Sequence, residues 1–468
     1  MAPVSVRIGT RAVLTWFLAH MGAAVHPAAA QRVAGLAPGV RDFVAVDAPV
    51  VALVGVRVID GTGAPTREDQ TVVIRDGLIE AVGLRSEIKI PNGATLLDLR
   101  AHTIVPGIVG MHNHLGFGWD FNPVQDARLY LGAGVTTIRT TGTYEPYREI
   151  NLKRDIDEGR LPGPRIHLTS PYVTGVGSQH RMTQISSPAQ ARRFVDYWAD
   201  EGMRWIKVYT RLPARELEAV IQQAHARGLR VTGHLCAVTA RDAAALGIDN
   251  IEHGLSSRDF DPAKPGDVCP TTGGRVTPPD DAVQATVLAL VRRGVALTAT
   301  LPEVEAYEPL RLAADPRVFD FVSPRTAAAY RDQRTQYDAQ RPTLGLAQAF
   351  VRSYASAGGL VVAGIDPVYP ALLPGFADQR NYELLLEAGF APEAAVRILS
   401  LNGASLLGVD SLFGSIEPGK VADLVVIKGD PTTQPKAIRD VVWVFKDGVG
   451  YDSTKLLTSV RNELSRRN

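Results

Sequence analysis

Cysteine is scarce in this chain of 468 residues, which contains only Cys236 and Cys269. Two thiols are too few for a zinc ribbon or another cysteine-based metal cluster. The pair could form a disulfide in an oxidising compartment or remain as two separate thiols. The sequence alone leaves both possibilities open.

The chain also has no excess of one charge. It contains 50 Lys and Arg residues and 49 Asp and Glu residues, so the formal net charge is +1. This balance gives no support for nucleic acid or an anionic membrane as a partner. The hydrophobic fraction of 45% excludes a largely disordered or collagen-like chain. The length suits one large domain and a smaller one.

The apolar run near the N-terminus, residues 12–25, is shorter than the roughly 20 residues that a membrane-spanning helix needs. Arg7 and Arg11 lie in front of it, and three alanines at 28–30 follow. This order is typical of a secretory signal peptide over residues 1–30. We therefore expect a periplasmic or secreted protein without a membrane partner after cleavage, with an uncleaved anchor as the alternative.

Short strand patterns separated by tight turns occur at both ends of the chain. Residues 46–105 contain Asp60-Gly61-Thr62-Gly63 and Arg75-Asp76-Gly77 as turns, and residues 409–455 repeat this pattern around Lys446-Asp447-Gly448. The two segments predict one small β-sandwich domain built from both chain ends.

Residues 106–408 alternate instead between β-branched runs and stretches with helical periodicity. Eight runs are predicted as strands: 108–112, 136–140, 165–169, 205–209, 230–233, 248–252, 296–300 and 360–365. This alternation predicts an α/β fold, a (β/α)8 TIM barrel. The stretch 254–280 is rich in Asp, Pro and Gly and is expected to be a long, functional loop.

The motif Gly110-Met111-His112-Asn113-His114 ends the first of these strands. Residues i and i+2 of a strand point to the same face, so His112 and His114 can direct two imidazoles at one metal. The spacing alone is weak evidence, because such a pair also arises by chance.

Further polar residues fall at the ends of later strands. Lys207 lies in the fourth, while His234, His253 and Asp366 follow the fifth, sixth and eighth. Taken singly, each has a structural explanation: a hydrogen-bonded histidine, a lysine reaching solvent, an aspartate capping a turn. Together they converge on the C-terminal face of a barrel, where active sites lie. We therefore predict a metal site.

Several longer motifs resemble the amidohydrolase superfamily, in particular imidazolonepropionase-like proteins and Xaa-Pro dipeptidases. The resemblance covers about residues 50–450 and rests on these segments: Pro106–His114, Gly134–Thr137, Ile206–Val208, Ile251–Gly254, Ala363–Asp366 and Gly414–Leu424.

The resemblance implies two divalent metals. His112 and His114 would bind the more buried one and His234 and His253 the second, while a carboxylated Lys207 (N6-carboxylysine) would bridge them. Asp366 would bind the first metal and shuttle a proton between a bridging hydroxide and the leaving amine. Such ligands suit zinc, with manganese, cobalt or iron as alternatives.

Two segments depart from the family pattern. Thr140-Thr141-Gly142 follows Arg139 where many relatives have Asp, and the strand-3 loop reads Gly175-Val176-Gly177-Ser178-Gln179-His180. Neither change touches a predicted ligand, but both could alter substrate contacts. His180 and Tyr209 are candidate donors to the substrate carbonyl or its oxyanion, with loop packing as the alternative.

The leading hypothesis is a metal-dependent amidase or dipeptidase acting on a small-molecule or dipeptide-like substrate. A mononuclear deaminase or imidazolone-type hydrolase is the enzymatic alternative, and a non-catalytic binding protein on the same fold is the third. A closed homo-oligomer is a reasonable expectation.

Overall fold

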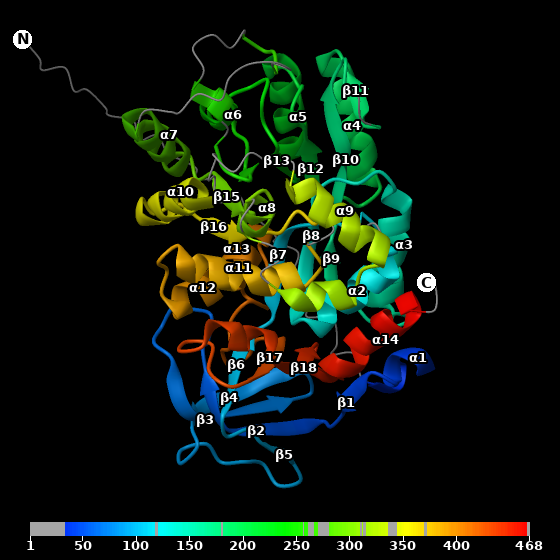
Figure 1. Ribbon diagram of the computed structural model, residues 1–468, viewed down its shortest axis with the longest axis vertical. Helices are drawn as coiled ribbons and strands as arrows, with labels where there is room; N and C mark the ends of the chain where they lie inside the picture. The colour runs from blue at the N-terminus through cyan, green and yellow to red at the C-terminus, as the bar shows by residue number, and fades with distance from the viewer. Residues whose placement is uncertain are drawn as a thin grey trace, which may run out of the picture.

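The structure is a computed structural model that describes the chain from residue 33 to residue 465 with several gaps (Figure 1). The described ranges are 33–117, 120–178, 181–255, 257–260, 266–269, 280–308, 311, 315–335, 344–368 and 372–465. The predicted signal segment, residues 1–30, lies outside them. Among the described residues, no helix has the length and apolar character that crossing a bilayer requires.

The eight predicted strands of the middle region are found close to their expected positions, and the third is split at Leu168 into two pieces. The strands are β7 (Ile108–Asn113), β8 (Val135–Thr140), β9 (Arg165–His167), β10 (Thr169–Gly175), β12 (Trp205–Val208), β13 (Arg230–Gly233), β14 (Asn250–Glu252), β15 (Ala296–Ala299) and β16 (Val361–Ala363). A further short strand, β11 (Thr183–Ile185), lies at one edge. Every pairing among them is parallel, and most of their residues are buried, as expected when helices cover a parallel sheet.

The predicted continuous ring of paired strands is not observed. β7, β8 and β9 form one sheet, and β11-β10-β12-β13-β14-β15-β16 form another. The first break coincides with the interruption of strand three at Leu168. The second lies between β16 and β7. There the backbone N–H groups of Ile365 and Asp366 both donate to the carbonyl oxygen of His112, each at 3.0 Å, in place of a regular ladder.

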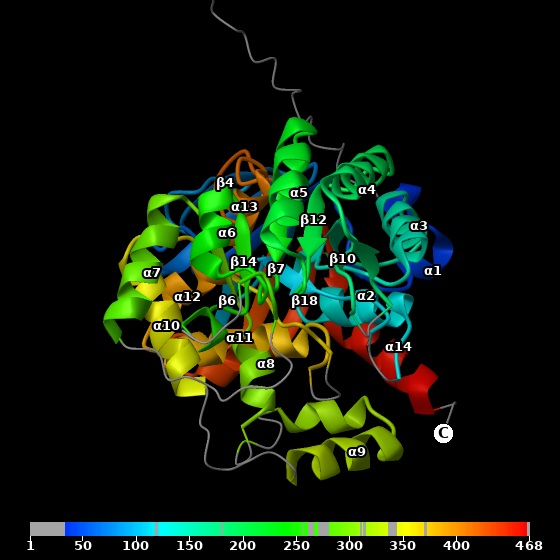
Figure 2. The ribbon, with the colours of Figure 1, turned by 90° about the horizontal axis from the view of Figure 1, so that it is seen from above.

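Helices surround these strands when the molecule is seen from above (Figure 2). They are α2 (Pro123–Gly132), α3 (Pro146–Asp157), α4 (Pro188–Asp200), α5 (Ala214–Ala226), α6 (Ala240–Leu246), α7 (Asp280–Arg292), α8 (Leu301–Ala306), α9 (Pro324–Thr335), α10 (Leu344–Ser356), α11 (Phe376–Glu387), α12 (Pro392–Leu399) and α13 (Leu401–Leu407). Local signals set where they begin: Asn122 and Gln125 form a capping box at α2, and the Thr239 hydroxyl caps α6.

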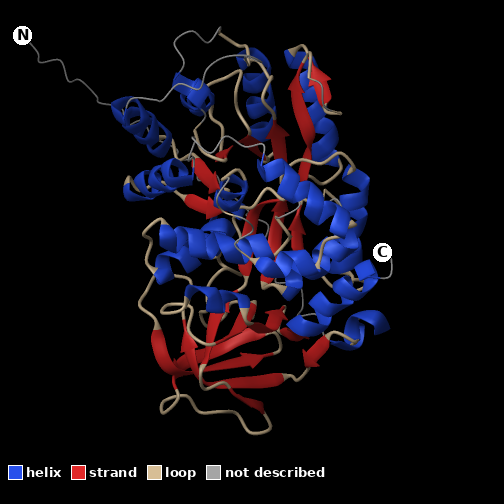
Figure 3. Ribbon diagram, in the orientation of Figure 1, coloured by secondary structure: helices blue, strands red, loops and turns tan. Residues whose placement is uncertain are grey.

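A separate nine-stranded sheet is built from both ends of the chain and lies at the bottom of Figure 3. Its strands are β1 (Val44–Val46), β2 (Val50–Val58), β3 (Arg67–Arg75), β4 (Leu78–Leu84), β5 (Thr95–Asp98), β6 (His102–Pro106), β17 (Leu424–Lys428), β18 (Val441–Lys446) and β19 (Val449–Asp452). The two ends meet where β17 pairs antiparallel with β6. They also share a hydrophobic core that includes Leu53, Ile104 and Phe445. The last helix, α14 (Ser453–Ser465), then packs back against α2.

Cys236 and Cys269 form a disulfide, with their Cα atoms 5.1 Å apart. The sequence had left this pairing open. The bond joins a residue two positions after His234 to the stretch 254–280, most of which lies outside the described residues. It therefore ties that stretch to the end of β13.

Candidate metal centre

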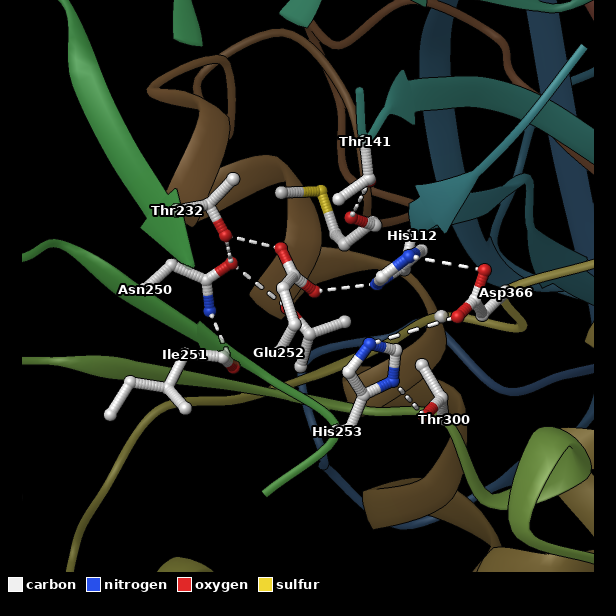
Figure 4. A network of polar contacts seen from close by, with 12 residues as sticks. His112, Thr141, Thr232, Asn250, Ile251, Glu252, His253, Thr300 and Asp366 are labelled. Carbon is white, nitrogen blue, oxygen red and sulfur yellow. Dashed lines mark hydrogen bonds and ion pairs between the residues drawn. The ribbon is translucent and has the colours of Figure 1, made fainter. Parts of the chain in front are cut away.

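The residues predicted to bind metal are carried by the C-terminal ends of five strands. His112 lies in β7 and His114 just after it, Lys207 lies in β12, and His234, His253 and Asp366 follow β13, β14 and β16. Figure 4 shows His112, His253 and Asp366 facing one another at the centre of a polar network. The parallel direction of the strands brings these distant residues to one end of the sheets.

Three imidazoles direct their Nε2 atoms at the carboxylate of Asp366. The Nε2 atoms of His114 and His112 lie 3.1 and 3.4 Å from Asp366 Oδ1, and that of His253 lies 3.7 Å from Oδ2. Although burial opposes it, the neighbouring His112 holds the pKa of Asp366 well below its usual value. An ionised carboxylate and three imidazole nitrogens thus share one small volume.

The opposite nitrogen of each imidazole, Nδ1, is held by an acceptor. His112 Nδ1 donates to Glu252 Oε2 at 2.8 Å, and His114 Nδ1 donates to the carbonyl oxygen of Gly142 at 3.2 Å. His253 Nδ1 lies 2.8 Å from Glu303 Oε2 and 2.9 Å from Thr300 Oγ1. An acceptor at Nδ1 fixes the proton there and leaves the lone pair of Nε2 for a metal ion.

Two residues of the cluster adopt backbone conformations that side chains rarely take. The φ angles of His253 and Asp366 are 68° and 44°, both in the left-handed region. Such strain concentrates at functional sites, and here it turns each side chain into the cluster just after a strand ends. Gly364 makes room for this arrangement, since a Cβ atom there would lie 2.4 Å from the Cβ of His112.

Lys207 is buried inside the same cluster, with 1% of its surface exposed. Its Nζ atom has no hydrogen-bond partner within the part of the chain that the structure describes. Burial lowers the pKa of this amine to about 8, against the opposing influence of Glu252 and Asp366. A buried amine that is easily deprotonated is suited to become a carbamate ligand.

Glu252, which orients His112, also forms a fully buried ion pair with Arg139. Arg139 NH2 donates to Glu252 Oε1 at 2.5 Å, while its NH1 donates to Asn250 Oδ1 at 2.9 Å. The Thr232 hydroxyl also donates to Glu252. Although burial opposes it, Arg139 holds the pKa of Glu252 well below its usual value. Glu252 therefore remains an ionised acceptor for His112.

His234 and Tyr209 adjoin the histidine cluster next to His253. The ring of His234 lies 4.6 Å from that of His253 and 5.1 Å from that of Tyr209, measured between centroids. Burial, and then the nearby His253, hold the pKa of His234 well below its usual value, so its imidazole is neutral. His180, the other predicted donor to the substrate, lies outside the described residues.

The donor set fits a divalent metal ion. Ligand atoms of His112, His253 and Asp366 all lie within 4.8 Å of one another. The buried His253 Nε2, like Lys207 Nζ, has no hydrogen-bond partner among the described residues. Neutral imidazole and carboxylate donors suit zinc and similar ions. His114, Lys207 and His234 adjoin this compact group.

Sequence reasoning missed the residues that orient the ligands: Glu252, Glu303 and Arg139. Glu252 stood within the motif Ile251–Gly254, and its place directly before His253 in a buried strand was an available signal. Glu303 lies in α8, outside every motif, so the sequence contained no comparable indication of its role.

Comparison with known proteins adds an independent finding. Residues 369–449 match the model of the amidohydrolase family. The match begins just after Asp366 and includes the tail motif Gly414–Leu424 as well as β17 and β18.

The chain is also similar to other proteins over most of its length. An enamidase from Eubacterium barkeri is 22% identical over 380 residues, which are 78% of this chain and 82% of the enamidase. A prolidase candidate from Bifidobacterium longum superposes with a TM-score of 0.66 and 25% identity, covering 88% of this chain and 98% of its own. A Xaa-Pro dipeptidase crystallised with methionine in its active site has a TM-score of 0.67 and 20% identity, covering 86% and 100%. These likenesses confirm the α/β fold of amidohydrolases.

Proposed function

We propose that this protein hydrolyses an amide or peptide C–N bond with the help of divalent metal ions. The observation that carries the proposal is the convergence of three Nε2 atoms on the Asp366 carboxylate, next to the buried amine of Lys207. The match of residues 369–449 to the amidohydrolase family model supports hydrolysis of a C–N bond.

His112, His114 and Asp366 would hold one ion, and His234 and His253 a second, with a carboxylated Lys207 between them. When bound, such ions polarise a carbonyl group and lower the pKa of water to about 7. The deep burial of His112, His114 and Lys207 supports the first site, and the contact between the rings of His234 and His253 supports the second.

Asp366 is positioned to move the proton. Its low pKa keeps the carboxylate ionised at neutral pH, so it can accept a proton from the attacking water. It can then pass that proton to the nitrogen of the leaving amine. We assign to Tyr209, and to His180 from the strand-3 loop, the role of donors to the substrate carbonyl oxygen.

A dipeptide or an N-acyl amino acid is the substrate class that we favour, because the similar structures include a Xaa-Pro dipeptidase. We also propose that the two central sheets form one (β/α)8 barrel, since Ile365 and Asp366, just after β16, donate backbone hydrogen bonds to His112 of β7. Export of the mature protein to the periplasm or medium remains part of this proposal.

One observation favours the mononuclear alternative, a deaminase or imidazolone-type hydrolase. Among the described residues, the compact ligand set consists of His112, His253 and Asp366, which is enough for a single ion. Metal content per chain separates the two hypotheses, and Lys207→Ala is the diagnostic variant. Two bound ions and full activity in that variant would contradict a bridging carbamate.

The test of the proposal compares Asp366→Asn with the wild type. We expect hydrolysis of dipeptides and N-acyl amino acids to fall about 10²- to 10⁴-fold while metal remains largely bound, because the proton acceptor is lost. Asp249→Asn is the matched control, since Asp249 precedes β14 at the opposite strand end and contacts His225 instead. Removal of metal with a chelator should abolish wild-type turnover, and zinc or manganese should restore it. Undiminished hydrolysis by Asp366→Asn would refute the role of this carboxylate.

A further inference from the structure

Four aromatic side chains continue the histidine cluster on one side. Phe117 stacks on His114 at 4.4 Å between ring centroids, and Tyr144 stacks on Phe117 at 5.3 Å. Tyr144 lies 5.2 Å from Tyr172, which in turn lies 5.5 Å from Tyr209. We call these four residues, Phe117, Tyr144, Tyr172 and Tyr209, the aromatic wall.

The wall and the histidines form a closed circuit of rings. Tyr209 contacts His234, which is followed by His253, His112 and His114. The ring centroids of successive histidines in this series lie between 4.6 and 5.4 Å apart. The wall therefore adjoins the predicted metal ligands His114 and His234. A substrate held at the metal centre has to lie against this wall or beside it.

The wall leads from the buried ligands to the surface. The planes of His114 and Phe117 differ by 23°, and those of Phe117 and Tyr144 by 20°, so the three rings form one stack. Tyr172 behind the stack is 5% exposed, whereas Tyr144 at its end is 42% exposed. A large exposed ring joined to a cluster of polar catalytic groups is typical of a binding surface.

The backbone beside the stack is also adapted to it. A Cβ atom at Gly142 would lie 2.5 Å from the ring of Tyr172, and the φ of 90° at this glycine is unfavourable for any other residue. The carbonyl oxygen of Gly142 is the acceptor that orients His114. One loop therefore positions both a metal ligand and the wall.

We propose that Phe117 and Tyr144 form a subsite for a planar, uncharged group of the substrate, an aromatic ring next to the scissile amide bond. This inference rests on the proposed function, whose substrate class it narrows. None of the four wall side chains carries a charge, so a charged group would gain no ion pair from them. A flat ring would instead stack on the wall and exclude water from both surfaces.

The test uses a matched pair of probes, N-acetyl-L-phenylalanine and N-acetyl-L-alanine. We expect the metal-loaded wild type to favour the aromatic probe about 10-fold in kcat/KM, as aromatic stacking and the added buried area allow. Phe117→Ala and Tyr144→Ala should reduce this preference to about twofold or less, and Tyr144→Phe should retain it because the ring remains. Tyr147→Ala is the matched control, since Tyr147 is 48% exposed but contacts Trp198 of α4, 6.0 Å away, instead of the wall.

Binding of the same probes to metal-loaded Asp366→Asn, measured by calorimetry, separates the subsite from the chemistry. Preferential binding of the aromatic probe, lost when Tyr144→Ala is added, would support the subsite. If the wild type nevertheless hydrolyses neither probe, the proposed function is refuted for these amides. Hydrolysis with an unchanged preference in Phe117→Ala and Tyr144→Ala would overturn the subsite and leave the function standing. If Asp366→Asn binds both probes equally, or binds neither, the subsite is also overturned.

Discussion

At the scale of the residue, the centre is organised by what holds the second nitrogen of each imidazole. His112, His114 and His253 have their Nδ1 atoms bonded to a carboxylate, a backbone carbonyl and a second carboxylate. These acceptors set the tautomer and the direction of each ring before any ion binds. Metal affinity should therefore depend on residues that are not themselves ligands.

Glu303→Gln tests this dependence. An amide at position 303 is a weaker acceptor for His253 Nδ1 than a carboxylate, so we expect metal affinity to fall about 10- to 100-fold. The free energy of unfolding should change little, because Glu303 is not paired with a buried arginine, unlike Glu252. Competition with a chelating dye measures the affinity. Glu218→Gln on the exposed face of α5 is the control, and equal affinity in the two variants would argue against the orienting role.

A second residue-scale prediction concerns the buried acid Glu149, which is 1% exposed and lies in α3. Burial raises its pKa to about 8, although the hydroxyls of Thr143 and Thr140 oppose the shift. A carboxyl group with a raised pKa in the folded state stabilises the fold below its unfolded pKa, near 4.5. That contribution is lost as the pH rises through about 8.

Replacing Glu149 by Gln removes this titration. We expect the wild type to lose stability between pH 5 and pH 8, and the variant to lose less by about 3–4 kcal/mol. Asp126 and Asp378, whose pKa values burial raises to about 7, contribute with the same sign in both proteins. Urea unfolding at several pH values provides the measurement. Parallel pH profiles for the two proteins would show that Glu149 is not the titrating group.

At the scale of the element, strand ends position the site, and a covalent link holds one of the loops that follow. The disulfide between Cys236 and Cys269 closes a segment with a sequence separation of 33 residues. This segment contains β14 and His253, so the bond restrains the chain on both sides of a predicted ligand. Its removal should affect stability more than chemistry.

The double variant Cys236→Ala/Cys269→Ala provides the measurement. Loop-closure entropy for a segment of this length corresponds to about 3–4 kcal/mol, which should appear as a lower free energy of unfolding in urea. Metal content of the folded protein should stay the same, because neither sulfur is a ligand. Wild-type protein under reducing conditions should behave like the variant. A reduced protein as stable as the oxidised one would contradict the prediction.

At the scale of the whole molecule, the chain ends cooperate with the central sheets. β17 pairs with β6, the strand that leads into β7 and its histidines. Helix α14 buries Leu456 and Val460, and its Glu463 forms a two-pronged ion pair with Arg128 of α2, each contact 2.7 Å. The C-terminal helix thus supports α2, which is far away in the sequence.

Deleting residues 453–468 tests this support. Loss of two fully buried aliphatic side chains and their partners on α2 should lower the free energy of unfolding by about 3–6 kcal/mol. Glu463→Gln, which removes only a half-exposed ion pair, should cost about 1 kcal/mol or less. Thermal and urea unfolding measure the loss of stability in the truncated protein and in Glu463→Gln. A truncated protein with wild-type stability would show that α14 is dispensable.

Local sequence patterns determined the strand positions and the choice of candidate site residues. The β-branched runs predicted the strands of the central sheets, and the polar residues at their ends, from His112 to Asp366, predicted which side chains would meet. Both follow from periodicity and from the common direction of parallel strands. Tertiary structure alone decided the rest: the pairing of His112 with Glu252, 140 residues away, the disulfide, and the incomplete ladder between β16 and β7. These depend on register and loop packing between segments far apart in the chain, which no local pattern encodes.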